Sequence, residues 1–131
     1  MPILHALQHT FGYVDRAVVP AIADALNLSR AEVFGVITFY HDFRSVPAGE
    51  HVLKVCRAEA CQAVGAVALA DHAKRTLGID WHETTADGRF TLEPVFCLGL
   101  CACGPAALID DEPVSGLDVA AFDQRLAELR A

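Results

Sequence analysis

The stretch that decides the fold runs from His51 to Gly78 and reads HVLKVCRAEACQAVGAVALADHAKRTLG. Its first residues form a short apolar segment typical of a β-strand, which ends at Cys56. The alanine-rich residues 62–77 predict a helix, and Gly78 ends it. A cysteine pair, Cys56 and Cys61, therefore begins where a strand ends.

Residues 79–131 continue the alternation of strands and helices. Two strands, 81–85 and 89–95, flank Asp87-Gly88, the strongest short hairpin signal, and Pro94 places the end of the second strand at an edge or terminus. A cysteine- and glycine-rich segment, 97–104, precedes a strand over 106–109. Asp118 caps a final helix, whose predicted buried residues are Val119, Phe122, Leu126 and Leu129. This order predicts an α/β domain over 50–131, a small sheet flanked by helices.

Residues 1–46 predict a small N-terminal helical lobe without cysteine, joined to that domain by a linker over 44–50. A first helix ends before Gly12, a second runs from Asp15 to Leu26, and Ser29 with Glu32 forms a capping box that opens a third. The apolar faces predicted for the three helices are Leu4, Leu7 and Phe11; Val18, Ile22 and Leu26; and Val33, Val36, Ile37 and Tyr40.

Composition and charge limit the classes of partner. The chain has 131 residues, of which 53% are apolar, so a packed core is expected. A net charge of −7 argues against nucleic acid and anionic membrane surfaces, because both bind basic faces. The first ten residues do not resemble a signal peptide, and no apolar run reaches the roughly 20 residues that span a bilayer. We therefore predict a cytoplasmic protein without membrane insertion, where clustered cysteines are more often metal ligands or redox groups than disulfides.

Five cysteines form two close pairs and one extra thiol. Cys56 and Cys61 have four residues between them, and Cys97 and Cys101 have three. Four thiolates suit Zn²⁺ or an iron–sulfur cluster, and these gaps are wider than the two-residue gap typical of zinc sites. A [2Fe–2S] cluster is favoured, while zinc and a metal-free pocket stay open. Spacing alone does not decide whether Cys97 pairs with Cys101 or with Cys103. We also expect Gly99 and Gly104 to let backbone amides turn toward sulfur.

Seven short motifs are informative together: VCRAEAC (55–61), GA (65–66), LGI (77–79), TTADGRFTL (84–92), CLGLC (97–101) with Gly104-Pro105, VITFY (36–40) and PAGEH (47–51). They resemble the thioredoxin-like [2Fe–2S] ferredoxins, the small cluster subunits of NADH:quinone oxidoreductase, NAD-linked hydrogenases and NAD-dependent formate dehydrogenases, and the resemblance covers residues 4–129. Residues 57–62 and 40–44 are most similar to the gamma subunit of a formate dehydrogenase. The resemblance implies a thioredoxin-like fold and a [2Fe–2S] cluster held by Cys56, Cys61, Cys97 and Cys101, with Cys103 outside it.

The chain has no glycine-rich nucleotide cradle, C-x-x-C redox pair or haem motif. A cluster without a substrate site predicts an electron carrier, not a catalytic subunit. The resemblance implies two partners, a flavin- and NAD-binding subunit and a larger molybdenum and iron–sulfur subunit that oxidises formate. The alternatives are the equivalent subunit of a quinone oxidoreductase or hydrogenase and, from another class, a zinc-stabilised structural docking module.

Overall fold

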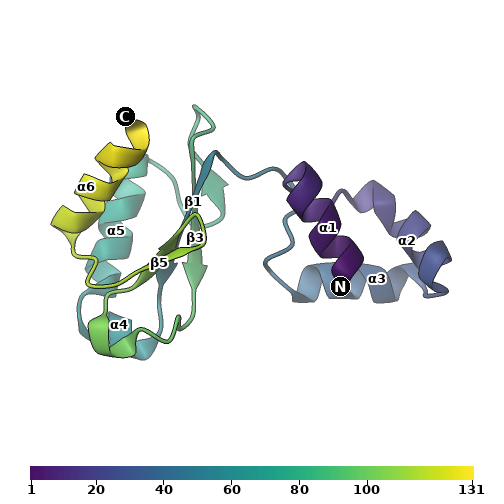
Figure 1. Cartoon of the computed structure of the whole chain (residues 1–131), viewed down its shortest axis with the longest axis horizontal. Coiled ribbons are helices and arrows are strands. Elements are labelled where there is room, and N and C mark those ends of the chain that lie inside the picture. Colours follow the sequence, from purple (N-terminus) through teal and green to yellow (C-terminus); the bar gives the residue numbers. More distant parts are fainter. The chain divides into compact units, whose positions relative to one another are not determined.

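The computed structural model describes residues 1–131, which form two compact units, Met1–Ala48 (unit 1) and Gly49–Ala131 (unit 2) (Figure 1). Unit 1 is entirely helical, and unit 2 combines a sheet with helices. No helix in either unit has both the length and the apolar character needed to cross a membrane.

Unit 1 contains the three predicted helices, the second of which is preceded by a 3-10 turn. The elements are α1 (Pro2–Phe11), η1 (Arg16–Val18), α2 (Val19–Leu26) and α3 (Arg30–Phe39). The predicted capping box at α3 is confirmed, because the Ser29 hydroxyl accepts from the Glu32 N–H while the Glu32 carboxylate accepts from the Ser29 N–H. Gly12 ends α1 in the left-handed conformation, as expected of a glycine at this position.

Three predicted core positions of unit 1 are wrong. Phe11 is 63% exposed and is the last residue of α1. Leu26 is 51% exposed because it is the last residue of α2, and the 3-10 turn makes Val19, with Ile22, the buried face of that helix. Tyr40 is 46% exposed because it lies beyond α3 with extended backbone. The core that unit 1 does form consists of Leu4, Val14, Val19, Ile22, Ala23, Val33, Ile37 and Phe43.

Unit 2 is built on a five-stranded mixed sheet with the order β2-β3-β1-β4-β5. The strands are β1 (His51–Cys56), β2 (Glu83–Thr84), β3 (Phe90–Val95), β4 (Ala107–Ile109) and β5 (Glu112–Val114). The helices are α4 (Glu59–Ala63), α5 (Ala66–Leu77), the 3-10 turn η2 (Cys101–Cys103) and α6 (Val119–Arg130). β1 pairs in parallel with β3 and antiparallel with β4, so β1 is the centre of the sheet.

The predicted hairpin is present as β2 and β3, and Gly88 has the positive φ that its turn requires. A second hairpin, β4–β5, was not predicted. Its turn is made by Asp110 and Asp111, both with positive φ, and β5 is only three residues long and contains Pro113. Asp-Asp is a weaker turn signal than Asp-Gly, and a proline demotes a strand pattern.

The single helix predicted over 62–77 is instead two helices, α4 and α5. Gly65, with φ of 105°, separates them, since a left-handed residue cannot continue an α-helix. Val119 was predicted to be buried in α6 but is 38% exposed, because it is the first residue of the helix. Phe122 and Leu126 are buried as predicted.

The sheet core lies between the sheet and two helices, α5 and α6, which lie side by side (Figure 1). It contains Leu53, Val55, Leu69, Ala73, Leu77, Phe90, Leu92, Ala107, Leu117, Phe122 and Leu126. This packing fixes β1 and β3, and therefore fixes where the loops that follow them begin.

Candidate metal centre

Both cysteine pairs lie at one end of the sheet. Because β1 and β3 are parallel neighbours with Cys56 opposite Val95, the segments that follow them leave the sheet at the same edge. The Arg57 N–H donates to the Val95 carbonyl at 2.8 Å, so the two segments stay adjacent beyond the strands. The Cys56 N–H donates to the Ala106 carbonyl at 3.0 Å, which brings the end of the second cysteine loop back to the first.

The first pair, Cys56 and Cys61, is buried. Their exposed fractions are 1% and 2%, and they pack with Ala66 and Ala106 in a small cluster, the cysteine pocket, that is separate from the sheet core. The partly buried residues packed against this pocket are Ala58, Val95, Leu98 and Leu100. Two thiols thus lie in an apolar pocket at the edge of the sheet.

The second pair, Cys97 and Cys101, is exposed, and its two sulfurs lie 3.6 Å apart. The loop turns back through two residues in the left-handed region, Cys97 with φ of 66° and Gly99 with φ of 77°. The left-handed region is uncommon for a residue other than glycine, so the backbone at Cys97 is held there by its surroundings. This turn brings the Cys97 thiol next to that of Cys101.

Cys103, the extra cysteine, is exposed at the end of η2. Its N–H donates to the Leu100 carbonyl at 2.9 Å, and its carbonyl accepts from the Gly116 N–H at 2.6 Å. The structure brings Cys97 to Cys101 and shows no corresponding sulfur contact for Cys103.

Backbone N–H groups converge on the sulfur of Cys56. Burial raises the pKa of this thiol, but hydrogen bonds from the N–H groups of Ala58, Cys97 and Leu98, together with the Cys61 thiol, outweigh burial and lower the pKa below its ordinary value. Two of these donors belong to the second cysteine loop. The loop therefore stabilises the thiolate of a cysteine that lies far from it in the sequence.

The other shifts show that the four thiols interact with one another. The pKa of Cys61 is raised above its ordinary value by burial and, further, by Cys56 and Cys101. A hydrogen bond from the Ala106 N–H lowers this pKa but does not outweigh the other effects. The pKa of Cys101 is raised by its contact with Cys97 and by the charge of Cys56. Neighbouring thiolates repel one another because they carry the same charge. All four can therefore be deprotonated together only with a cationic partner.

The donors to sulfur are the N–H groups of Ala58, Cys97, Leu98 and Ala106. Gly99, which was expected to let backbone amides turn toward sulfur, has a φ of 77° in the loop that carries the Cys97 and Leu98 donors. Gly104 has a different role, since a Cβ added there would lie 3.3 Å from the Cys61 sulfur and 2.9 Å from Val64 Cγ2. Proximity in the sequence could have identified two of these donors, because Ala58 lies two residues after Cys56 and Leu98 lies directly after Cys97.

This donor set fits a two-iron centre. A [2Fe–2S] cluster takes two thiolates on each iron, and the chain offers one buried and one exposed pair at the same sheet edge. No three or more His, Cys, Asp and Glu side chains surround a single ion position in the structure. A structural zinc site instead takes four donors around one ion.

Comparison with known proteins gives a consistent family. Residues 1–130 match the family described as thioredoxin-like [2Fe-2S] ferredoxin. The chain is 37% identical over 132 residues to NADH-quinone oxidoreductase subunit 2 of Thermus thermophilus, covering 100% of this chain and 73% of that relative. It is 33% identical over 126 residues to NADP-reducing hydrogenase subunit HndA of Solidesulfovibrio fructosivorans, covering 96% of this chain and 74% of that relative.

A third relative belongs to the NADH-quinone oxidoreductase of Pseudomonas aeruginosa. The chain is 40% identical to this relative over 109 residues, which are 83% of this chain and 66% of the relative. The chain thus spans slightly less than two thirds of that relative and about three quarters of the other two.

A solved structure supports the same conclusion. The fold matches an NAD+-reducing [NiFe]-hydrogenase with a TM-score of 0.79 and 27% identity, covering 97% of this chain and 22% of that chain. The predicted fold, a helical lobe followed by a thioredoxin-like α/β domain, is confirmed by this match and by the family. The chain therefore belongs to the thioredoxin-like [2Fe–2S] ferredoxin family, whose members carry a [2Fe–2S] cluster.

Proposed function

We propose that Cys56, Cys61, Cys97 and Cys101 hold a [2Fe–2S] cluster and that the chain is an electron-transfer subunit of an NAD-dependent oxidoreductase complex. One observation carries this proposal: a buried and an exposed pair of thiols lie at one edge of the sheet, with the exposed sulfurs 3.6 Å apart. When bound, such a cluster supplies one-electron transfer at a potential adjusted by sulfur hydrogen bonds and solvent exposure.

The two pairs have different roles in this proposal. The Cys56 and Cys61 thiolates are shielded from water and receive backbone N–H groups, which stabilise negative charge on sulfur. Cys97 and Cys101 lie on the exposed side, where another protein can approach closely. Electrons therefore enter and leave on the side of the exposed pair.

The parent complex is proposed to be a formate dehydrogenase. Residues 57–62 and 40–44 support it, because they are most similar to the gamma subunit of that enzyme. The chain has no nucleotide-phosphate cradle of its own. The partners would then be a flavin- and NAD-binding subunit and a molybdenum-containing subunit that oxidises formate. The second candidate, a subunit of a quinone oxidoreductase or hydrogenase, is favoured by the names of the relatives.

Metal analysis of serine variants tests the ligand assignment. The purified chain should contain two irons and two acid-labile sulfides and show a rhombic paramagnetic signal only after reduction. Cys101→Ser should lose this iron, and Cys103→Ser, the matched control two residues away, should retain it. Stoichiometric zinc without iron would instead support a structural docking module, and the reverse outcome for the two serine variants would make Cys103 the ligand.

Activity of the intact complex tests the parent enzyme. The complex that co-purifies with a tagged chain is tested in three separate assays. These supply NAD+ with formate, NAD+ with hydrogen, and NADH with a quinone. Formate-dependent NAD+ reduction is expected. Hydrogen-dependent NAD+ reduction or NADH:quinone activity without formate oxidation would assign the chain to the second candidate.

A further inference from the structure

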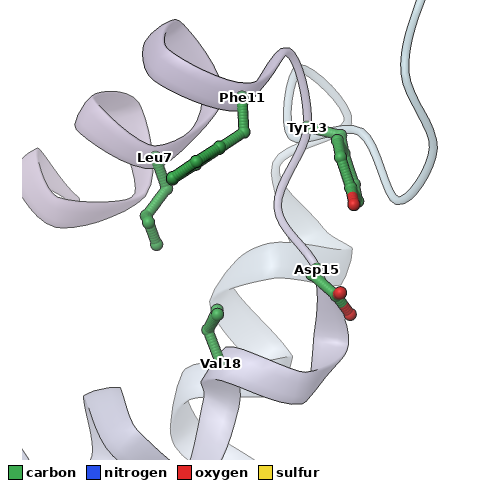
Figure 2. Close-up of a pocket in the computed structure, with 5 residues that line it drawn as sticks. All are labelled: Leu7, Phe11, Tyr13, Asp15 and Val18. Carbon is green, nitrogen blue, oxygen red and sulfur yellow. The ribbon is translucent and has the colours of Figure 1, made fainter.

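Most of the chain's exposed large apolar side chains lie in unit 1, although it is the smaller unit. Phe11 is 63% exposed and Phe39 is 72% exposed. One hollow, shown in Figure 2, is lined by Leu7, Phe11, Tyr13, Asp15 and Val18. Its two polar side chains, Tyr13 and Asp15, lie on the side away from Leu7 and Phe11, and the hollow is lined by no cationic group.

A second depression of unit 1 carries such groups. We call it the arginine groove, and it is lined by Arg16, Val19, Pro20, Arg30, Ala31 and Phe34. Its volume is about 360 Å³, and its walls come from η1, the start of α2 and the start of α3. The groove therefore combines two arginine side chains with apolar side chains, although the chain as a whole has a net charge of −7.

The two guanidinium groups are placed by their neighbours. The Arg16 guanidinium carbon lies 5.2 Å from the centre of the Phe34 ring, within the range of a cation–π contact. Arg30 precedes Phe34 by four residues in α3, so both side chains lie on one face of the helix. Phe34 thus lines the groove together with both arginines, and it is 39% exposed.

The carboxylates nearest to these arginines in the sequence accept hydrogen bonds from other groups. Asp15 accepts a hydrogen bond from the Ala17 N–H at 2.9 Å, and the Glu32 carboxylate accepts from the N–H and hydroxyl of Ser29 at 2.8 and 2.9 Å. Both acids are therefore used as helix caps. Neither Arg16 nor Arg30 forms an ion pair in the structure.

We propose that the arginine groove binds an acidic segment of a partner protein, in which a carboxylate is flanked by apolar side chains. The carboxylate would lie between Arg16 and Arg30, whose forked N–H groups match its geometry, and an apolar side chain would cover Phe34 and Pro20. A protein segment fits better than nucleic acid, because residues 1–48 contain only three arginines and no lysine, too few for a basic face. This site lies outside the cysteine loops and does not depend on the proposed cluster.

A peptide titration of the full, cluster-loaded chain tests the proposal. The probe is acetyl-Glu-Phe-Glu-Leu-Glu-amide, its neutral control is acetyl-Gln-Phe-Gln-Leu-Gln-amide, and binding is followed by ¹⁵N amide and arginine side-chain shifts. The acidic peptide should shift signals at Arg16, Arg30 and Phe34 saturably, and the neutral peptide should bind about fivefold to tenfold more weakly. Equal binding of the two peptides, or shifts centred elsewhere, would overturn the proposal.

Charge-reversal variants distinguish binding in the arginine groove from non-specific electrostatic attraction between the peptide and the chain. Arg16→Glu/Arg30→Glu should weaken the acidic peptide about tenfold, whereas Arg75→Glu/Arg125→Glu, with the same change of net charge in unit 2, should leave it unchanged. If the first variant loses its helical circular dichroism, Arg16→Gln/Arg30→Gln takes its place. Equal effects of the two variants would contradict the groove. Concentration-dependent shifts at the groove without peptide would assign it to a second copy of the chain and overturn the proposed partner.

Discussion

Gly104 lies where the second cysteine loop passes Cys61, and we predict that Gly104→Ala destabilises the cysteine pocket. The φ of Gly104 is −66°, which any residue adopts, so the cost comes from space alone. A Cβ there would lie 2.9 Å from Val64 Cγ2 and 3.3 Å from the Cys61 sulfur. The first distance is too short to persist, and the second requires the sulfur to move by a few tenths of an ångström.

The expected cost follows from which neighbour can move. Val64 is 54% exposed and can change rotamer toward solvent, but Cys61 is 2% exposed and packed within the cysteine pocket. Overpacking a filled interior costs about 1–3 kcal/mol, so we expect about 2 kcal/mol, which is about a thirtyfold change in the folding equilibrium constant. Displacement of the Cys61 sulfur should also reduce the iron retained by the chain.

Urea unfolding followed by fluorescence measures this cost. Trp81 is the only tryptophan and packs against the sheet core, so its emission reports unit 2. Gly49→Ala is the matched control, because its Cβ would lie 3.0 Å from the Arg89 carbonyl carbon and 3.0 Å from the Phe90 nitrogen, and neither atom belongs to a cysteine loop. Both variants should lose stability, and only Gly104→Ala should lose iron.

Two results would refute this reasoning. Unchanged stability and full iron content in Gly104→Ala would mean that the pocket is not tightly packed at Cys61. Equal iron loss in Gly49→Ala would mean that the loss reflects general instability of unit 2. Adding Val64→Ala to Gly104→Ala removes the shorter contact, so it should recover part of the stability while the contact with Cys61 persists.

Three further predictions concern the core, a helix cap and a surface carboxylate. Phe90→Ala should cost unit 2 about 3–5 kcal/mol in urea unfolding, because Phe90 is 1% exposed in the sheet core; a loss below about 1 kcal/mol would contradict its placement. Ser29→Ala removes the cap of α3 and should cost about 1 kcal/mol, seen as faster amide exchange in the first turn of that helix but not in α5. Hydrogen bonds from Lys74 and the Trp81 N–H lower the pKa of the Asp80 carboxyl. The charged carboxylate therefore stabilises the folded chain at pH values above its ordinary pKa of 3.8, and this stabilisation is lost as the pH falls through the lowered pKa. Asp80→Asn should therefore be less stable than the parent at neutral pH, and that difference should disappear in acid urea titrations; a difference independent of pH would exclude the charge as its cause.

Local signals in the sequence predicted much of the secondary structure. The capping box at Ser29 and the Asp87-Gly88 turn act through neighbouring residues, so they hold in any tertiary setting. The apolar spacing and composition of a segment did not predict where its helix begins and ends. Leu26 fits the apolar spacing of α2 but lies at its end, and Gly65 interrupts a helix that composition alone would continue.

The sequence by itself determined that four cysteines, in two pairs, follow predicted strands and suit a metal centre. Only the tertiary structure decided which thiols meet, because residues 62–96 separate the pairs and the sheet joins them through the parallel pairing of β1 with β3. It also brought Cys97 to Cys101, through a left-handed residue at Cys97 that no local pattern indicates. The burial of Cys56 and Cys61 likewise depends on packing between distant segments, which is a property of the sheet and its loops together.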